Sequence, residues 1–203
     1  YYGGDVIGAG SKLGDVWVRH PIDGGGTPWG KIAGAHIYGR PLTISECGQN
    51  TPKTYRAAYY PAFAAMACFQ GWDGITGYAY TQSGNPRDHW RDQFNAAYEW
   101  ESDPASIASI AMGSLIMRRG DVAPARDTVV MQLPESEWWT LHWQDDGEKQ
   151  HRNLPEFNAA VEQHKTVVVL GDTIPAALSS APVITTDAGL AYTHPGSSLR
   201  SDT

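Results

Sequence analysis

Glu46 is the residue of this chain whose type and position are best suited to chemistry. It stands near the end of a short predicted strand, residues 41–48. Pro41 suits a strand start, and the alternation of Leu42 and Ile44 with polar residues is typical of a strand. In a parallel α/β sheet or barrel the carboxyl ends of the strands face the ligand, so a carboxylate there is placed for catalysis. The alternative is an exposed or salt-bridged strand-end glutamate, since structural charges also occupy such positions.

A helix and a second strand follow this first strand at the spacing of a βαβ unit. Residues 61–70 are rich in alanine, with Pro61 suited to the first helical position and a glycine just after the last. Residues 74–80 are predicted to form the next strand. A βαβ unit implies adjacent parallel strands with the helix crossing between them. Glu46 and Tyr80 should then emerge on the same rim of the sheet.

Three stretches of this sequence carry a resemblance to a known family. Two of them resemble strands seven and eight of a clan-A glycoside hydrolase barrel: RPLTISECG and QGWDGITGYAY. The third is similar to the last barrel helix and exit segment of the beta-galactosidase-like and cellulase-like members of that clan: SDPASIASIAMGSLIMRRGDVAPA. The resemblance covers about residues 15–125. It implies an α/β fold, a partial (β/α)8 barrel holding the last two to three βα units, in which Glu46 is the catalytic nucleophile of a retaining mechanism.

The resemblance also suggests which residues would contact a sugar. Tyr80 would pack beneath or beside the bound ring. A strand over residues 15–20 would be the sixth of the barrel and would bring Trp17 and His20 near the site, although local packing explains these two residues equally well. Tyr78, and Asn50 after the Glu46 strand, complete the predicted set of substrate-binding residues.

The second catalytic carboxyl group is not expected in this chain. A retaining glycosidase needs two carboxyl groups about 5–5.5 Å apart, and the resemblance places the acid/base at the end of the fourth strand. A complete barrel takes about 250 residues, whereas the chain has 203. We therefore expect an internal segment of a larger enzyme that is inactive alone. The alternative is a non-catalytic carbohydrate-binding or structural barrel segment, since fold by itself does not establish catalysis.

The remaining elements divide the chain into two predicted regions. Residues 1–125 are expected to form the C-terminal part of the barrel, and residues 126–203 a β-rich, incomplete C-terminal region with strands at 128–133 and 166–170. In the first region a helix should run from Pro28 to about Tyr38.

The clearest predicted helix starts at Pro104, after the N-cap Asp103, and ends at Gly120. Its apolar positions recur at helical spacing. One face of this helix collects Ile107, Ile110, Ala111, Ser114 and Leu115.

Composition excludes several classes of function. The formal net charge of −7 argues against a nucleic-acid partner. The sequence contains no apolar run of the ~20 residues that a membrane span requires. The two cysteines, Cys47 and Cys68, provide neither a disulfide framework nor zinc-ligand spacing, and no metal or cofactor is predicted. The predicted partner is a carbohydrate substrate.

Overall fold

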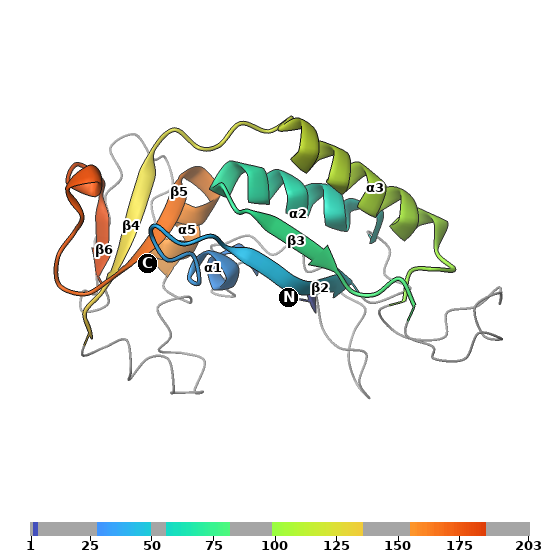
Figure 1. The fold of residues 1–203 in the computed structure, drawn as a ribbon, viewed down its shortest axis with the longest axis horizontal. Coiled ribbons are helices and arrows are strands. Elements are labelled where there is room, and N and C mark those ends of the chain that lie inside the picture. The colour runs from blue at the N-terminus through green and yellow to red at the C-terminus, as the bar shows by residue number, and fades with distance from the viewer. Residues whose placement is uncertain (1, 4–27, 50–55, 82–98, 136–154, 186–203) are drawn as a thin grey trace. The chain divides into compact units, whose positions relative to one another are not determined.

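The computed structural model describes five parts of the chain, which form an α/β structure with two compact units (Figure 1). The described parts are residues 2–3, 28–49, 56–81, 99–135 and 155–185. The first unit takes residues 2–3, 43–49, 56–68, 72–81 and 99–123, and the second takes residues 28–42, 69–71, 124–135 and 155–185. The second unit therefore includes residues 28–42, which the sequence prediction assigned to the barrel region.

The first unit contains a parallel three-stranded sheet in the order β1-β2-β3. Its strands are β1 (Tyr2–Gly3), β2 (Thr43–Gln49) and β3 (Gly74–Gly77), and helix α2 (Arg56–Gln70) connects β2 to β3. The predicted βαβ unit of adjacent parallel strands is confirmed. Strand β3 ends three residues earlier than predicted, since the carbonyls of Ala79 and Tyr80 accept hydrogen bonds from Trp100 and Glu101 instead.

Helix α2 begins earlier than the sequence suggested, and the prediction that Pro61 occupies its first position is wrong. Pro61 lies inside the helix, whose first residue is Arg56. The Arg56 side chain forms an ion pair with Asp103, at 2.5 Å between Nε and Oδ2, which holds the first turn in place. The predicted end is confirmed, because Gly71 has the left-handed φ of 69° that favours glycine.

Helix α3 (Pro104–Arg119) has the predicted ends but packs with an unexpected face. Asp103 accepts a hydrogen bond from the Ala105 N–H as N-cap, and Gly120 ends the helix at φ 65°. Figure 1 shows α2 and α3 running alongside each other by β2 and β3. The buried residues of α3 are the small ones, Ser106, Ser109 and Gly113. Large apolar side chains stay exposed: Ile107 (40%), Met112 (55%) and Leu115 (55%).

The physical reason for this packing is the close approach of the two helices. A Cβ atom at Gly113 would lie 2.8 Å from the carbonyl oxygen of Tyr60 in α2. Ser109 Oγ accepts a hydrogen bond from the Tyr60 N–H at 3.3 Å. Only small residues fit such a contact, so the apolar stripe predicted from the sequence is not the packed face.

The second unit contains another parallel sheet, in the order β5-β4-β6. The predicted strands are confirmed as β4 (Thr128–Leu133) and β5 (Lys165–Leu170), which pair over six consecutive residues. Helix α5 (Pro155–Gln163) lies between them in sequence, and a 3-10 helix (Ala176–Leu178) precedes β6 (Val183–Thr185). The core cluster of this sheet includes Val130, Val167, Val169 and Leu178.

Helix α1 (Pro28–Ala33) is shorter than predicted. The predicted helix ran to about Tyr38, and that prediction is wrong beyond Ala33. Ile37 forms a parallel bridge with Val168 of β5. The Val168 N–H donates to the carbonyl of His36 at 2.7 Å, and the Tyr38 N–H donates to the carbonyl of Val168 at 2.8 Å. Residues 36–38 therefore extend along β5 because a long-range backbone pairing replaces the local helical one.

Gln70, at the end of α2, is a buried amide that hydrogen-bonds three residues of the second unit, between the end of α5 and the start of β5. Its Nε2 donates to the carbonyls of Val161 and His164, both at 2.6 Å. Its Oε1 accepts from the N–H of Thr166 at 2.9 Å and from its hydroxyl at 3.1 Å. All four hydrogen-bonding positions of this side chain are thus used.

Candidate functional site

Glu46 is the fourth of the seven residues of β2 and lies at an irregularity of that strand, so the prediction that it stands at the strand end is wrong. Ile44 pairs with Ile75 and Cys47 with Gly77, so Ser45 and Glu46 together stand opposite the single residue between them on β3. This is a β-bulge, a feature that re-aims side chains and is frequent beside active sites. Ile44 and Cys47 are both buried although they are three residues apart, and Glu46 is exposed. The bulge thus lets β2 bury its apolar residues while presenting a carboxylate to solvent.

Cys47 anchors the chain immediately after Glu46. Its carbonyl accepts the Tyr78 N–H at 2.6 Å and the Tyr60 hydroxyl at 3.5 Å. Its Sγ donates to the carbonyl of Thr76 at 3.4 Å. Burial raises the pKa of the Cys47 thiol to about 11. The side chain therefore stays protonated at neutral pH and serves as an anchor rather than as a nucleophile.

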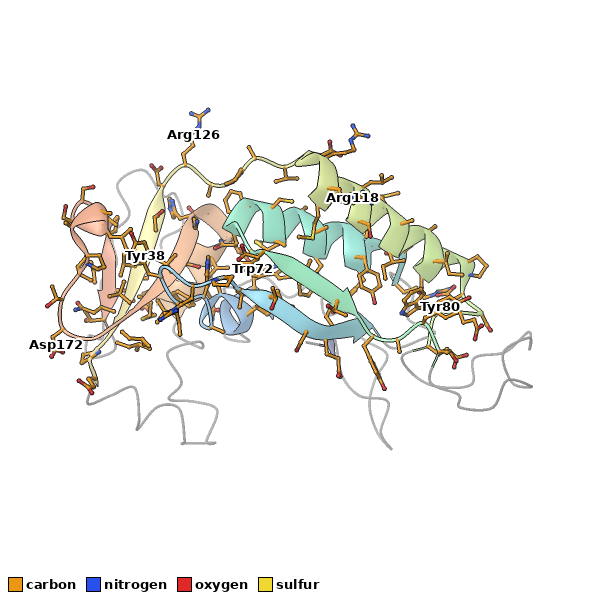
Figure 2. All side chains as sticks on the ribbon, viewed as in Figure 1. Tyr38, Trp72, Tyr80, Arg118, Arg126 and Asp172 are labelled. Atoms are coloured by element: carbon orange, nitrogen blue, oxygen red, sulfur yellow. The ribbon has the colours of Figure 1, made fainter. Side chains whose placement is uncertain are left out.

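Tyr78 and Tyr80 follow the carboxyl end of β3. Tyr78 is 37% exposed and Tyr80 is 54% exposed. Figure 2 shows Tyr80 beyond the tip of β3, where its ring meets Trp100 edge to face at 5.1 Å between centroids. The peptide bond between Tyr78 and Ala79 is cis. Because Tyr78 is hydrogen-bonded to Cys47, the backbone after β3 is joined to the chain directly beside Glu46.

The structure therefore places three of the predicted site residues in or directly after two neighbouring strands. Glu46 is on β2, and Tyr78 and Tyr80 are in the segment after β3. The other three predicted residues, Trp17, His20 and Asn50, lie outside the described residues. Their predicted place in the site stays a prediction.

Sequence reasoning missed the buried carboxylate of Glu99, which precedes α3. Glu99 is only 1% exposed, and the next residue, Trp100, donates its N–H to the carbonyl of Ala79 at 3.2 Å. A buried carboxylate is therefore held near the end of β3. The alternation of acid and tryptophan in Glu99-Trp100-Glu101 was the available signal, because charged residues are rarely fully buried without a partner or a role.

Asp103 is a second buried carboxylate in this region, and its surroundings give it a structural role. It accepts hydrogen bonds from two nitrogens of Arg56 and from the hydroxyl of Ser106. Burial alone would raise the pKa of Asp103, but the hydrogen bonds and charge of Arg56, with those of Ser106 and Ala105, hold that pKa below its ordinary value. A carboxylate kept ionised in this way joins the starts of α2 and α3.

A small cavity of about 110 Å³ lies among α2, β3 and α3. Its walls are mostly apolar and include Ala64, Ile75, Ile110 and Met117. A sugar site requires convergent polar groups. This cavity is therefore a gap in the packing of the helices and not a substrate site.

Other classes of site find no support in the described parts of the chain. No group of three or more His, Cys, Asp or Glu side chains among the described residues could hold a metal ion. None of the helices in the described ranges has the length and apolar character needed to cross a membrane. The chain was also compared with protein-family models, curated proteins and solved structures, and none of them matches.

Proposed function

We propose that this chain carries the nucleophile of a retaining glycoside hydrolase and that its first unit is part of a (β/α)8 barrel. Support for the fold comes from the sequential order of the parallel strands β1, β2 and β3, with α2 between the last two. Consecutive parallel neighbours joined by helices are the repeating unit of such a barrel. The resemblance of the sequence to clan-A barrels motivates the choice among α/β folds.

The observation that carries the functional proposal is the exposed carboxylate of Glu46 on a bulge in the middle of β2. Two exposed tyrosines, Tyr78 and Tyr80, follow the carboxyl end of the adjacent strand. Aromatic rings offer flat apolar surfaces with a polar tip, which suit the faces and hydroxyls of a sugar. A carboxylate on one strand and aromatic residues after the adjacent strand are groups that glycosyl transfer uses.

In the proposed mechanism a Glu46 oxygen attacks the anomeric carbon as the bond to the leaving oxygen breaks. The leaving oxygen takes a proton from a second carboxylic acid, and a covalent glycosyl–enzyme forms. Water, deprotonated by the same second carboxylate, then attacks the anomeric carbon and releases Glu46. Tyr78 and Tyr80 would hold the sugar. We assign the second carboxyl group to no residue of this chain.

The test is covalent trapping in the protein expressed from its full reading frame. The protein is incubated with a panel of 2-fluoro-glycosides, which form the glycosyl–enzyme but release it slowly, and is then digested for peptide mapping by mass spectrometry. The label is expected on Glu46. Glu46→Gln should keep the fold and lose activity by about 10³-fold or more, and azide should restore turnover to Glu46→Ala.

The matched control is Asp73→Asn. Asp73 is an exposed carboxylate immediately before β3, at the amino end of the strand, and its loss should leave labelling unchanged. A label on a different carboxylate, or full activity in Glu46→Gln, would refute the nucleophile assignment. Sugar binding without turnover or labelling would favour a non-catalytic carbohydrate-binding segment.

A further inference from the structure

The strand ladder alone does not hold Glu46 in place. The pairs between β2 and β3 flank the bulge at Ile44 and Cys47, while Ser45 and Glu46 share one opposing position. The extra residue of a bulge is left out of the regular pairing. The backbone position of Glu46 therefore also depends on how firmly the residue after it is fixed.

Tyr60 of α2 reaches that next residue from the helix layer. Its hydroxyl donates to the carbonyl of Cys47 at 3.5 Å, and its side chain is buried at 7% exposure. Burial also raises the pKa of Tyr60 well above its ordinary value. The hydroxyl therefore keeps its proton, and remains a donor, across the pH range in which glycosidases work.

Two glycines make room for Tyr60. A Cβ atom at Gly77 of β3 would lie 2.8 Å from the Tyr60 hydroxyl and 2.9 Å from Cδ1 of Ile110. A Cβ atom at Gly113 of α3 would lie 2.8 Å from the Tyr60 carbonyl oxygen. Contacts this short do not occur in folded proteins without a shift of one partner. The side chain of Tyr60 is thus enclosed by Gly77 and its backbone by Gly113, two positions that only glycine can occupy without a shift of Tyr60.

We infer that Tyr60 is a positioning residue for Glu46, acting through the carbonyl of Cys47, with Gly77 providing the space for its hydroxyl. This inference rests on the proposed function. Tyr60 contacts β2 from the helix side, through the carbonyl of Cys47. It orients the nucleophile by fixing the bulge, so that the Glu46 carboxylate keeps one direction relative to the segment after β3.

Tyr60→Phe tests the inference, since it removes only the hydroxyl. With a 2-fluoro-glycoside that labels the wild-type protein, the rate constant of labelling should fall by about threefold, the scale of one long hydrogen bond, with the inhibitor binding constant unchanged. Gly77→Ala should act in the same direction by displacing the hydroxyl. Thr166→Val is the matched control, because it deletes a buried hydroxyl in the second unit and should lower stability without slowing the labelling of folded protein.

A Tyr60→Phe protein that labels at the wild-type rate, or that slows no more than Thr166→Val, would overturn the inference. Failure of the proposed function has a different signature, in which Glu46 of the wild-type protein takes no label from any glycoside. The inference is then decided by amide hydrogen exchange. Faster exchange in Tyr60→Phe confined to residues 45–47 and 76–78 supports positioning, and unchanged exchange there overturns it.

Discussion

The two sheets of this protein differ in regularity, and the difference separates a part built for packing from a part able to present chemistry. Strands β4 and β5 pair over six consecutive residues without interruption. Most of their side chains are buried, as in parallel strands covered on both faces. Strands β2 and β3 pair with a register shift, and Thr43, Ser45 and Glu46 on β2 are exposed. A carboxylate can be held in solvent on the interrupted strand, but not on the continuous one without a large desolvation penalty.

The helices differ in a similar way. In the second unit a single polar side chain, Gln70, satisfies the end of α5 and the start of β5. In the first unit α2 and α3 meet through small residues, and the large apolar residues of α3 remain exposed. Loss of one polar side chain should therefore destabilise the second unit, whereas gain of one methyl group should destabilise the first.

Gln70→Leu should have the largest effect on stability. It keeps the side-chain volume but leaves the carbonyls of Val161 and His164 and the N–H of Thr166 buried without partners. We expect a loss of about 3–5 kcal/mol in the free energy of unfolding, measured by urea denaturation. Gln163→Leu, which removes only a 3.4 Å bond to the carbonyl of Ala159 on the same helix, should cost less than about 1 kcal/mol. Equal losses in the two variants would contradict the central role of Gln70.

Deletion of Ser45 would make β2 as regular as β4 and so removes the contrast between the sheets. Pairs on either side of the bulge keep their register, so the fold should survive with a small change in melting temperature. The Glu46 carboxylate would move by a fraction of a residue, and displacement of about 1 Å costs about 10²-fold in rate. Labelling of Glu46 by the 2-fluoro-glycoside is the measurement. Unchanged labelling would show that the bulge has no part in the site.

Gly113→Ala should lower the free energy of unfolding by about 2 kcal/mol, because the added methyl group overlaps the backbone of Tyr60. The sign is diagnostic, since the same change in the middle of an exposed helix stabilises by about 1 kcal/mol. Thermal and urea unfolding measure it. A stabilised Gly113→Ala protein would mean that α2 and α3 do not meet as closely as described.

Protonation of Asp103 in acid should lower the contribution of its ion pair with Arg56 to the free energy of unfolding. The expected loss is about 1.5 kcal/mol, the scale of a charge-assisted hydrogen bond. The folded-state pKa of Asp103 lies below the ordinary value of 3.8. Its contribution to stability is therefore present above that value and is lost as the pH falls through the lower folded pKa. The difference in unfolding free energy between wild type and Asp103→Asn should shrink below about pH 4. A difference that stays constant as the pH falls below about 4 would contradict this role.

The smallest effect on stability is expected on the exposed face of α3. Replacing both Met112 and Leu115 by Gln should change the free energy of unfolding by less than about 0.5 kcal/mol, because both side chains are 55% exposed. The same change should reduce concentration-dependent association in light scattering, since it removes exposed apolar surface. Met131→Gln, at a fully buried site in β4, is the contrasting control and should cost several times more.

Local chemistry made part of this structure readable from the sequence. The ends of α3 follow from Asp103, Pro104 and Gly120, and the end of α2 from Gly71, because capping and left-handed backbone involve only neighbouring residues. The β-branched runs of β4 and β5 and the βαβ order of β2, α2 and β3 were likewise apparent. The sequence also placed Glu46 in this strand, but at its end rather than at its middle, and the chemical role of Glu46 stays a prediction.

Tertiary contacts decided the rest. Helix α1 stops at Ala33 because residues 36–38 pair with β5, and α2 starts at Arg56 because that residue reaches Asp103. Which face of α3 is buried depends on how closely α2 approaches, a property of two helices rather than of one periodic pattern. The bulge at Ser45 and Glu46 likewise arises from the register with β3. Spacing along a single strand does not encode that register, so the exposure of Glu46 was settled only when the two strands came together.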